Sequence, residues 1–169
     1  MLPNCAGDRP VNKTAVHTKI IARLAAELEL LTQTALATHA EATDEENKAE
    51  DKYDTRGLEA SYLALGQSKQ DEETALALQQ FQSLALRDFA RGEPISLGAL
   101  VALEAGPARN YYFVGPRAGG TEVRDDGREV MVITPQSPLG RQLVGKKQGD
   151  PVQLELGGKR SEFRVAQVS

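Results

Sequence analysis

The densest group of side chains able to do chemistry is a run of carboxylates between Glu41 and Asp54. Within these 14 residues the chain carries seven acidic side chains and two lysines, a balance of −5. The acids are Glu41, Asp44, Glu45, Glu46, Glu50, Asp51 and Asp54. Crowded carboxylates repel one another unless water or a cation lies between them, and hard cations such as Mg²⁺ bind to such oxygens. The run therefore indicates either a solvated turn or a surface that brings negative charge to a cation.

Two amphipathic helices flank the acidic run and must position it. In the first, which Thr14 is expected to cap, apolar residues recur at spacings of three and four, a heptad pattern. They are Ile21, Leu24, Leu28, Leu31, Ala35 and Ala42, with Thr38 on the same face. The second is predicted from about Asp51 to Arg91. Apolar residues stand there at near-helical intervals, namely Leu58, Tyr62, Leu65, Leu76, Phe81, Leu84 and Phe89. The pattern weakens from Gly66 to Glu73, where the seam is expected to shift.

Each amphipathic helix needs a partner for its apolar stripe, and the joint between these two is short and polar. We therefore predict an antiparallel coiled-coil hairpin that folds back at about residues 42–48. A first helix of about 28 residues gives a rod of roughly 40 Å. The acidic run, at 41–54, then forms the tip of that rod.

The composition changes at Gly92-Glu93-Pro94, after which glycine, proline and β-branched residues become frequent. Five short apolar runs, at 100–103, 111–114, 130–133, 152–156 and 163–168, predict the strands of a small antiparallel β domain. One short helix is expected after Ser137-Pro138, an N-cap followed by proline at the first helical position. The fold class is therefore α+β, with a flexible tail at 1–12, a hairpin at 13–91, a linker at 92–98 and a β domain at 99–169.

Length, charge and cysteine content narrow the function classes. The 169 residues carry a net charge of −4 and no tryptophan, so a basic or base-stacking surface for sequence-specific DNA binding is not expected. No apolar run reaches the ~18 residues of a membrane span, and the N-terminus does not resemble a secretion signal. Cys5 is the only cysteine, which excludes an internal disulfide and a cysteine-based zinc site. We expect a monomeric cytoplasmic protein.

The segment around the predicted short helix resembles a known family. It reads Thr134-x-x-Ser137-Pro138-Leu139-Gly140-x-x-Leu143-Val144-Gly145-Lys146-x-x-Gly149-Asp150-x-Val152. This run is similar to the C-terminal signature of the bacterial Gre transcript-cleavage factors, and the order of hairpin, linker and β domain agrees along nearly the whole chain. The resemblance implies an FKBP-like C-terminal domain that docks at the rim of the RNA polymerase secondary channel, with the hairpin inside the channel.

The resemblance also implies how the tip would act. The chain would be no enzyme itself and would bind no cofactor alone. Its tip carboxylates would complete the shell of a Mg²⁺ ion shared with the polymerase active site and so stimulate hydrolysis of a backtracked transcript, touching the nascent RNA only indirectly. Asp44 is the first candidate for the metal, Glu46 for the metal or the attacking water, and Glu45 for either role.

For docking, the resemblance implies the loop that enters the short helix, here Gln136-Ser137-Pro138. The family has Asp or Asn at the first of these positions, whereas this chain has a neutral glutamine. Simple helix initiation would account equally well for Ser137 and Pro138, and both roles stay open.

The tip departs from the family pattern, in which two acids three apart precede asparagine, as Asp-x-x-Glu-Asn. This chain has Thr43-Asp44-Glu45-Glu46-Asn47, so threonine stands where the family has aspartate. Three functions follow as hypotheses. The first is an elongation factor that stimulates transcript cleavage, and the second is a regulator that occupies the secondary channel without stimulating cleavage. The third is a hairpin interaction or chaperone module with no role at the polymerase.

The cleavage hypothesis predicts a specific effect at the tip. Asp44→Asn should sharply reduce cleavage of backtracked transcripts while polymerase binding stays near normal, because a lost metal ligand costs several kcal/mol of transition-state stabilisation. Glu46→Gln should give a smaller loss, and Asp54→Asn, beyond the turn, almost none. Cleavage of the RNA in a stalled complex measures the effect. Cleavage at the wild-type rate by all three variants would exclude these carboxylates as metal ligands.

Overall fold

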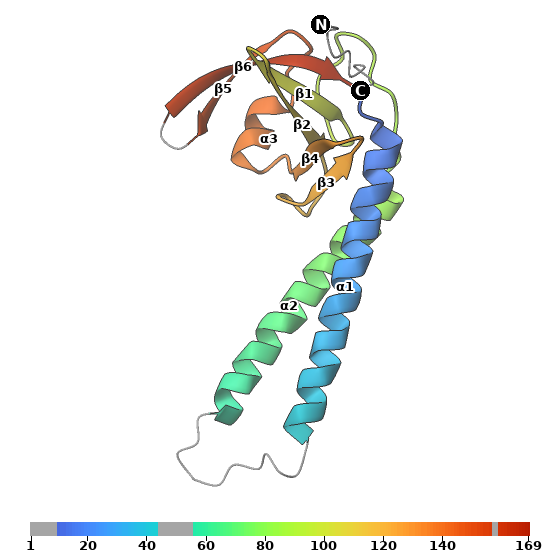
Figure 1. The fold of residues 1–169 in the computed structure, drawn as a ribbon, viewed down its shortest axis with the longest axis vertical. Helices are drawn as coiled ribbons and strands as arrows, with labels where there is room; N and C mark the ends of the chain where they lie inside the picture. Colours follow the sequence, from blue (N-terminus) through green and yellow to red (C-terminus); the bar gives the residue numbers. More distant parts are fainter. Residues whose placement is uncertain (1–9, 44–55, 157–158) are drawn as a thin grey trace, which may run out of the picture. The chain divides into compact units, whose positions relative to one another are not determined.

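The computed structural model describes residues 10–43, 56–156 and 159–169. In these ranges two long helices come first, followed by the strands of a sheet, with one short helix between the fourth and fifth strands (Figure 1). The helices are α1 Lys13–Thr43, α2 Arg56–Ser83 and α3 Pro138–Leu143. The strands are β1 Leu100–Ala105, β2 Ala108–Val114, β3 Glu122–Asp125, β4 Arg128–Ile133, β5 Pro151–Leu156 and β6 Lys159–Val168. The predicted α+β class is thereby confirmed.

The chain divides into two compact units. One comprises the chain up to Ile20 together with Ser83–Ser169, and the other comprises Ile21–Gln82. The first turns of α1 therefore belong with the sheet, although the sequence pattern assigned them to the hairpin. Whether residues 92–98 separate two parts that fold independently stays a prediction.

The predicted seam of α1 is confirmed in the hairpin unit. Leu24 is buried, and the other seam residues from Ile21 to Thr38 are half-buried, while almost every residue between them is exposed. Ala42 lies outside the described side chains. Leucine side chains recurring every three or four residues must lie on one face of a helix, so this part of the prediction follows from geometry alone.

The predicted seam of α2 is wrong in its first half. Tyr62 and Leu65 are 68% and 61% exposed. The least exposed side chains, counted back from Phe81 in steps of three and four, are Ala77, Thr74, Asp71 and Gln67. A straight helix keeps the same face towards its partner, so the face set by Phe81 continues even where its residues are polar.

Both ends of the hairpin helices differ from the sequence prediction. Asn12, not Thr14, caps α1, because its Oδ1 accepts a hydrogen bond from the Ala15 amide at 3.1 Å. The helix α2 ends at Ser83, eight residues before the predicted end at Arg91. The reason lies in Phe89, which is buried in the core below the sheet. Its ring also lies under the charged groups of Lys13 and Arg87, at 5.0 and 4.1 Å.

The strands form one six-stranded sheet in the order β3-β4-β2-β1-β6-β5. All neighbouring pairs are antiparallel except β2 and β4, which are parallel, so the sheet is mixed where the sequence suggested an antiparallel one. Strand β3 was not predicted, because its sequence Glu122-Val-Arg-Asp125 contains one apolar residue. In the turn after it, Asp126 and Gly127 both have positive φ, as a tight hairpin turn requires.

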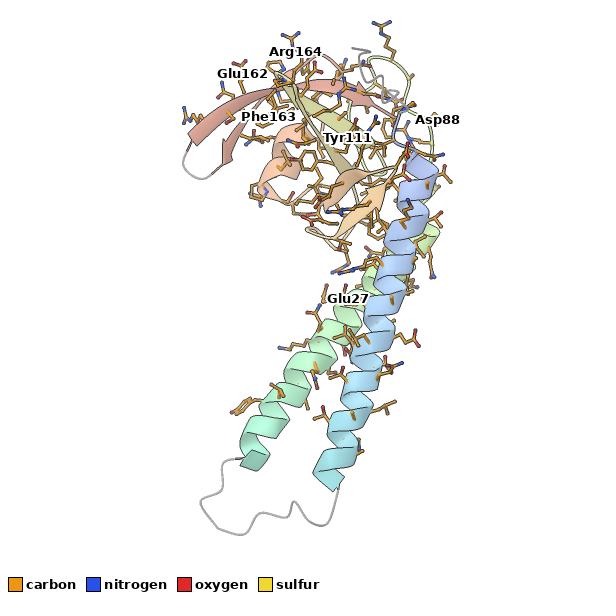
Figure 2. The ribbon with its side chains drawn as sticks, viewed as in Figure 1. Glu27, Asp88, Tyr111, Glu162, Phe163 and Arg164 are labelled. Atoms are coloured by element: carbon orange, nitrogen blue, oxygen red, sulfur yellow. The ribbon has the colours of Figure 1, made fainter. Side chains whose placement is uncertain are left out.

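The two faces of the sheet are covered by different parts of the chain. One face carries Val101, Leu103 and Val165 and packs on Leu143 of α3 and on Phe89. Residues of β6 alternate across the sheet, with Phe163 buried between the exposed Glu162 and Arg164 (Figure 2).

The opposite face carries Leu100, Ala102 and Phe113 and lies against the start of the chain. Val11 lines a small cavity together with Leu100 and Ala102, and the rings of His17 and Phe113 are 6.1 Å apart. The β domain therefore uses residues before Ile20 as part of its own core.

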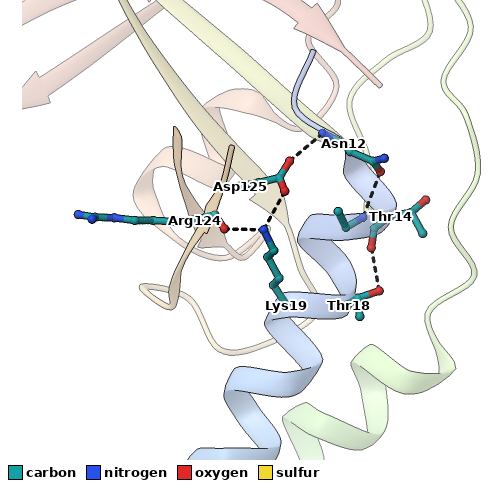
Figure 3. Close-up of polar contacts among 7 residues, drawn as sticks. Asn12, Thr14, Thr18, Lys19, Arg124 and Asp125 are labelled. Carbon is teal, nitrogen blue, oxygen red and sulfur yellow. Dashed lines mark hydrogen bonds and ion pairs between the residues drawn. The ribbon is translucent and has the colours of Figure 1, made fainter. Parts of the chain in front are cut away.

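Polar contacts fix the start of α1 to the β3–β4 hairpin (Figure 3). The Asp125 carboxylate accepts hydrogen bonds from the main-chain amide of Asn12 at 3.1 Å and from Lys19 Nζ at 2.8 Å. Lys19 Nζ also donates to the Arg124 carbonyl at 2.8 Å. The hydrogen bond from Lys19 is the main reason why the pKa of Asp125 lies below its usual value.

This ion pair gives a pH-dependent contribution to stability. Because the pKa of Asp125 is lowered in the folded state, its contribution is present above the unfolded pKa of about 3.9 and is lost as pH falls through the folded pKa. Asp125→Asn should destabilise the β domain by about 1 kcal/mol at pH 7 and by almost nothing near pH 2. Urea unfolding followed by tyrosine near-UV circular dichroism measures this. Asp126→Asn, the same change at the exposed neighbour, is the control, and a pH-independent difference would contradict the prediction.

Candidate functional site

The loop that leads into α3 is built around the Ser137 side chain. Ser137 Oγ donates to the Thr134 carbonyl at 2.7 Å and accepts a hydrogen bond from the Gly140 amide at 3.0 Å. Ser137 is thus the N-cap of α3, and Pro138 occupies the first helical turn. The predicted role of these two residues in helix initiation is confirmed, and the Ser137 hydroxyl is already bonded within the loop.

Gly140 allows the helix to approach the loop closely. A Cβ atom at this position would lie 1.8 Å from the Thr134 carbonyl oxygen, far inside van der Waals contact. No side chain can therefore replace this glycine unless the main chain moves. The close approach explains why a glycine stands three residues after the capping serine.

The residues that follow α3 form main-chain hydrogen bonds with the segment that precedes β1. Gly145, with φ of 88°, donates to the Ile95 carbonyl at 2.9 Å, and the Ile95 amide donates to the Lys146 carbonyl at 2.7 Å. Further along, the Lys147 amide donates to the Asp150 carboxylate at 2.8 Å, which closes the turn into β5. The glycines and aspartate of the signature thus serve the fold.

The side chains left for a partner lie beside this framework. Gln136 and Pro138 are exposed, whereas Ser137 is half-buried. Two apolar side chains on the segments joined by the Ile95–Gly145 bond are also exposed, Leu97 at 42% and Val144 at 39%. The sequence analysis did not single out these two residues. The signal that could have found them is that each stands directly before a glycine, Gly98 or Gly145. We call Gln136, Pro138, Leu97 and Val144 the α3 surface.

The three tip residues Asp44, Glu45 and Glu46 lie outside the described residues, and their magnesium role stays a prediction. Within the described ranges no group of three or more histidine, cysteine or acidic side chains is placed to hold a metal ion. No helix in those ranges has the length and apolar character needed to cross a membrane.

An open groove lies over β2 and β4. Its volume is about 460 Å³, and its lining includes Tyr111, Arg128, Glu122 and Glu129. A hydrogen bond between the two glutamates raises the pKa of Glu122, because one carboxyl must keep its proton to donate. Arg128 lies 5.6 Å from the Tyr111 ring centre. Charges of both signs line this groove, so it does not select a cation or an anion.

The signature loop and the sheet around it relate this chain to known proteins. Residues 92–169 match the family model described as the C-terminal part of transcription elongation factor GreA/GreB. The transcription inhibitor protein Gfh1 of Thermus thermophilus is 32% identical over 125 residues, which cover 72% of this chain and 75% of that protein. The chain belongs to the GreA/GreB family. Gfh1 of Thermus aquaticus is 30% identical over the same length, 72% of this chain and 74% of that protein. The resemblance found in the sequence is confirmed.

Solved structures of this family are also similar to the chain. The crystal structure of Gfh1 from Thermus thermophilus is 23% identical, with a TM-score of 0.38, over 88% of this chain and 94% of that one. A GreA/GreB factor from Nitrosomonas europaea is 17% identical, with a TM-score of 0.37, over 66% and 92%. The signature loop itself lies within the residues that the family model matches.

The α3 surface predicts a separation between binding and folding. Pro138→Arg should weaken binding to RNA polymerase at least tenfold, about 1.4 kcal/mol, and lower the melting temperature only slightly, because the side chain is exposed and acts only at the first turn of α3. Pro107→Arg, an exposed proline in the β1–β2 turn, is the matched control. Gly140→Ala should instead lower the melting temperature, because of the close approach to Thr134. Gel filtration with polymerase and thermal melting measure the two effects, and unchanged binding by Pro138→Arg would remove the loop from the interface.

Proposed function

We propose that this chain is a transcription regulator that binds RNA polymerase at the secondary channel and inhibits RNA synthesis without stimulating transcript cleavage. The observation that carries the proposal is the identity of 30–32% over 125 residues to three Thermus proteins named transcription inhibitor protein Gfh1. The regulator would work in the cytoplasm, where bacterial polymerase transcribes, as a monomer with its C-terminal domain at the channel rim.

The tip sequence supports the same choice. Shared metal sites require ligand oxygens within about 0.5 Å of the productive geometry. Threonine stands at Thr43 where a cleavage factor has its first carboxylate, and Asp44 follows one position later. A carboxylate that is one residue out of register cannot bind the same ion unless the main chain moves. Occupation of the channel therefore fits this chain better than recruitment of a catalytic magnesium.

Inhibition follows from the charge of the tip. A balance of −5 within 14 residues would repel a nucleoside triphosphate that enters by the same channel. This repulsion is overcome as the nucleotide concentration is raised, so the inhibition should be competitive with nucleotide.

Transcript cleavage is the second candidate function. It is favoured by the three consecutive acids Asp44, Glu45 and Glu46, which place a carboxylate near each position that the cleavage factors use. The FKBP-like character of the C-terminal domain belongs to the same family expectation and bears equally on both candidates.

Purified polymerase separates the two functions. The chain should co-migrate with polymerase on gel filtration, slow RNA synthesis at low nucleotide concentration and lose at least tenfold of this inhibition at high nucleotide concentration. Backtracked complexes should remain uncut at every magnesium concentration. Asp44→Asn combined with Glu46→Gln should relieve the inhibition, whereas Asp54→Asn, with one charge less beyond the turn, should not. Accelerated cleavage by the wild-type chain would instead establish the second candidate, and absence of binding would exclude both.

A further inference from the structure

The hairpin unit has a closed half and an open half. In the closed half, next to the bounds of this unit at Ile21 and Gln82, the seam is apolar and shielded from water. Leu24 is 2% exposed, Ala77 3% and Phe81 0%. Burial of a large side chain such as Leu24 or Phe81 contributes about 1.5–3 kcal/mol to stability. These contacts therefore stabilise the pairing of the two helices in this half.

The seam changes character at Asp71. Counting from Phe81, the least exposed residues of α2 are next Thr74, Asp71 and Gln67. The seam of α1 continues with Leu28 and Leu31, followed by the smaller Ala35 and Thr38. Within the described residues, Asp71 Oδ1 is a buried oxygen without a hydrogen-bond partner. A polar oxygen shielded from water without a partner is unfavourable, and this cost disappears once water reaches it.

Beyond Asp71 the two helices leave space between them. An open cavity of about 600 Å³ lies there, lined by Leu31, Tyr62, Leu63, Gly66, Gln67 and Gln70. Large apolar side chains of this half also point to solvent, at 61–68% exposure: Leu30, Leu36, Tyr62, Leu63 and Leu65. The apolar contacts that close the first half are thus missing from the second.

We propose that Asp71 divides the hairpin into a fixed half and an opening half. The part of α1 beyond Leu28 and the part of α2 before Asp71 separate and close again in the free protein. Separation hydrates the shielded Asp71 Oδ1 and exposes few buried apolar side chains, so little free energy opposes it, as in other locally opening elements. The inference concerns the free chain and does not depend on the proposed function.

Hydrogen exchange of the full chain, read by mass spectrometry, tests this proposal. In the wild type, amides of residues 28–40 and 62–70 should exchange at least tenfold faster than those of 21–27 and 74–82. Asp71→Leu should slow the exchange of the first two ranges at least tenfold, because leucine completes the apolar seam. Glu72→Leu, an exposed acid replaced on the same turn, should change neither.

Two results would overturn the proposal. Fraying of the helix ends alone would also speed exchange near the tip, but that exchange would be insensitive to Asp71→Leu. A polar seam residue can instead serve to fix the register of two helices. In that case Asp71→Leu would alter the protection of residues 74–82 or the oligomeric state. Should Asp71→Leu fail to fold, Asp71→Asn removes the charge at constant shape and should slow the same amides about threefold.

Discussion

A six-stranded sheet with apolar side chains on both faces needs a cover on each side, and this requirement organises the molecule. One face is covered by the helix α3 and by the segment around Phe89, which precedes β1. The second face, with Leu100 and Phe113, is met by residues from Val11 to Ile20. The start of α1 therefore serves two purposes along one helix. Its first turns complete the sheet unit, and the remainder from Ile21 forms the hairpin.

This double role explains why polar contacts concentrate at Asp125. An apolar face positions a helix loosely, because dispersion and burial have little directionality. The hydrogen bonds from Asn12 and Lys19 to one carboxylate add direction, and the bond from Lys19 to the Arg124 carbonyl shields the edge strand β3. A short, exposed strand edge is otherwise a site for unwanted pairing with another chain.

The success of the sequence analysis followed the range of the interactions involved. The seam of α1, the strands with apolar runs and the Ser137 cap depend on neighbours within a few residues, and all were predicted. The second helix failed at Tyr62 and Leu65, because its face is set by Phe81 more than a dozen residues away. Strand β3 was missed, because pairing with β4 rather than its own composition makes Glu122–Asp125 a strand. The parallel pairing of β2 with β4 and the exposure of Leu97 and Val144 depend on distant segments that no local pattern records.

The geometry of the signature loop bears on what the family resemblance can mean. Ser137 is bonded to Thr134 and Gly140, and Gly140 permits a contact that any side chain would prevent. These residues would be required in any protein with this domain, whatever the activity of its tip. The motif therefore identifies the fold and the family, but it cannot distinguish an inhibitor from a cleavage factor. In the function that we propose, a one-residue shift at Asp44 changes the activity, whereas the sheet domain, its cap and its exposed α3 surface stay the same.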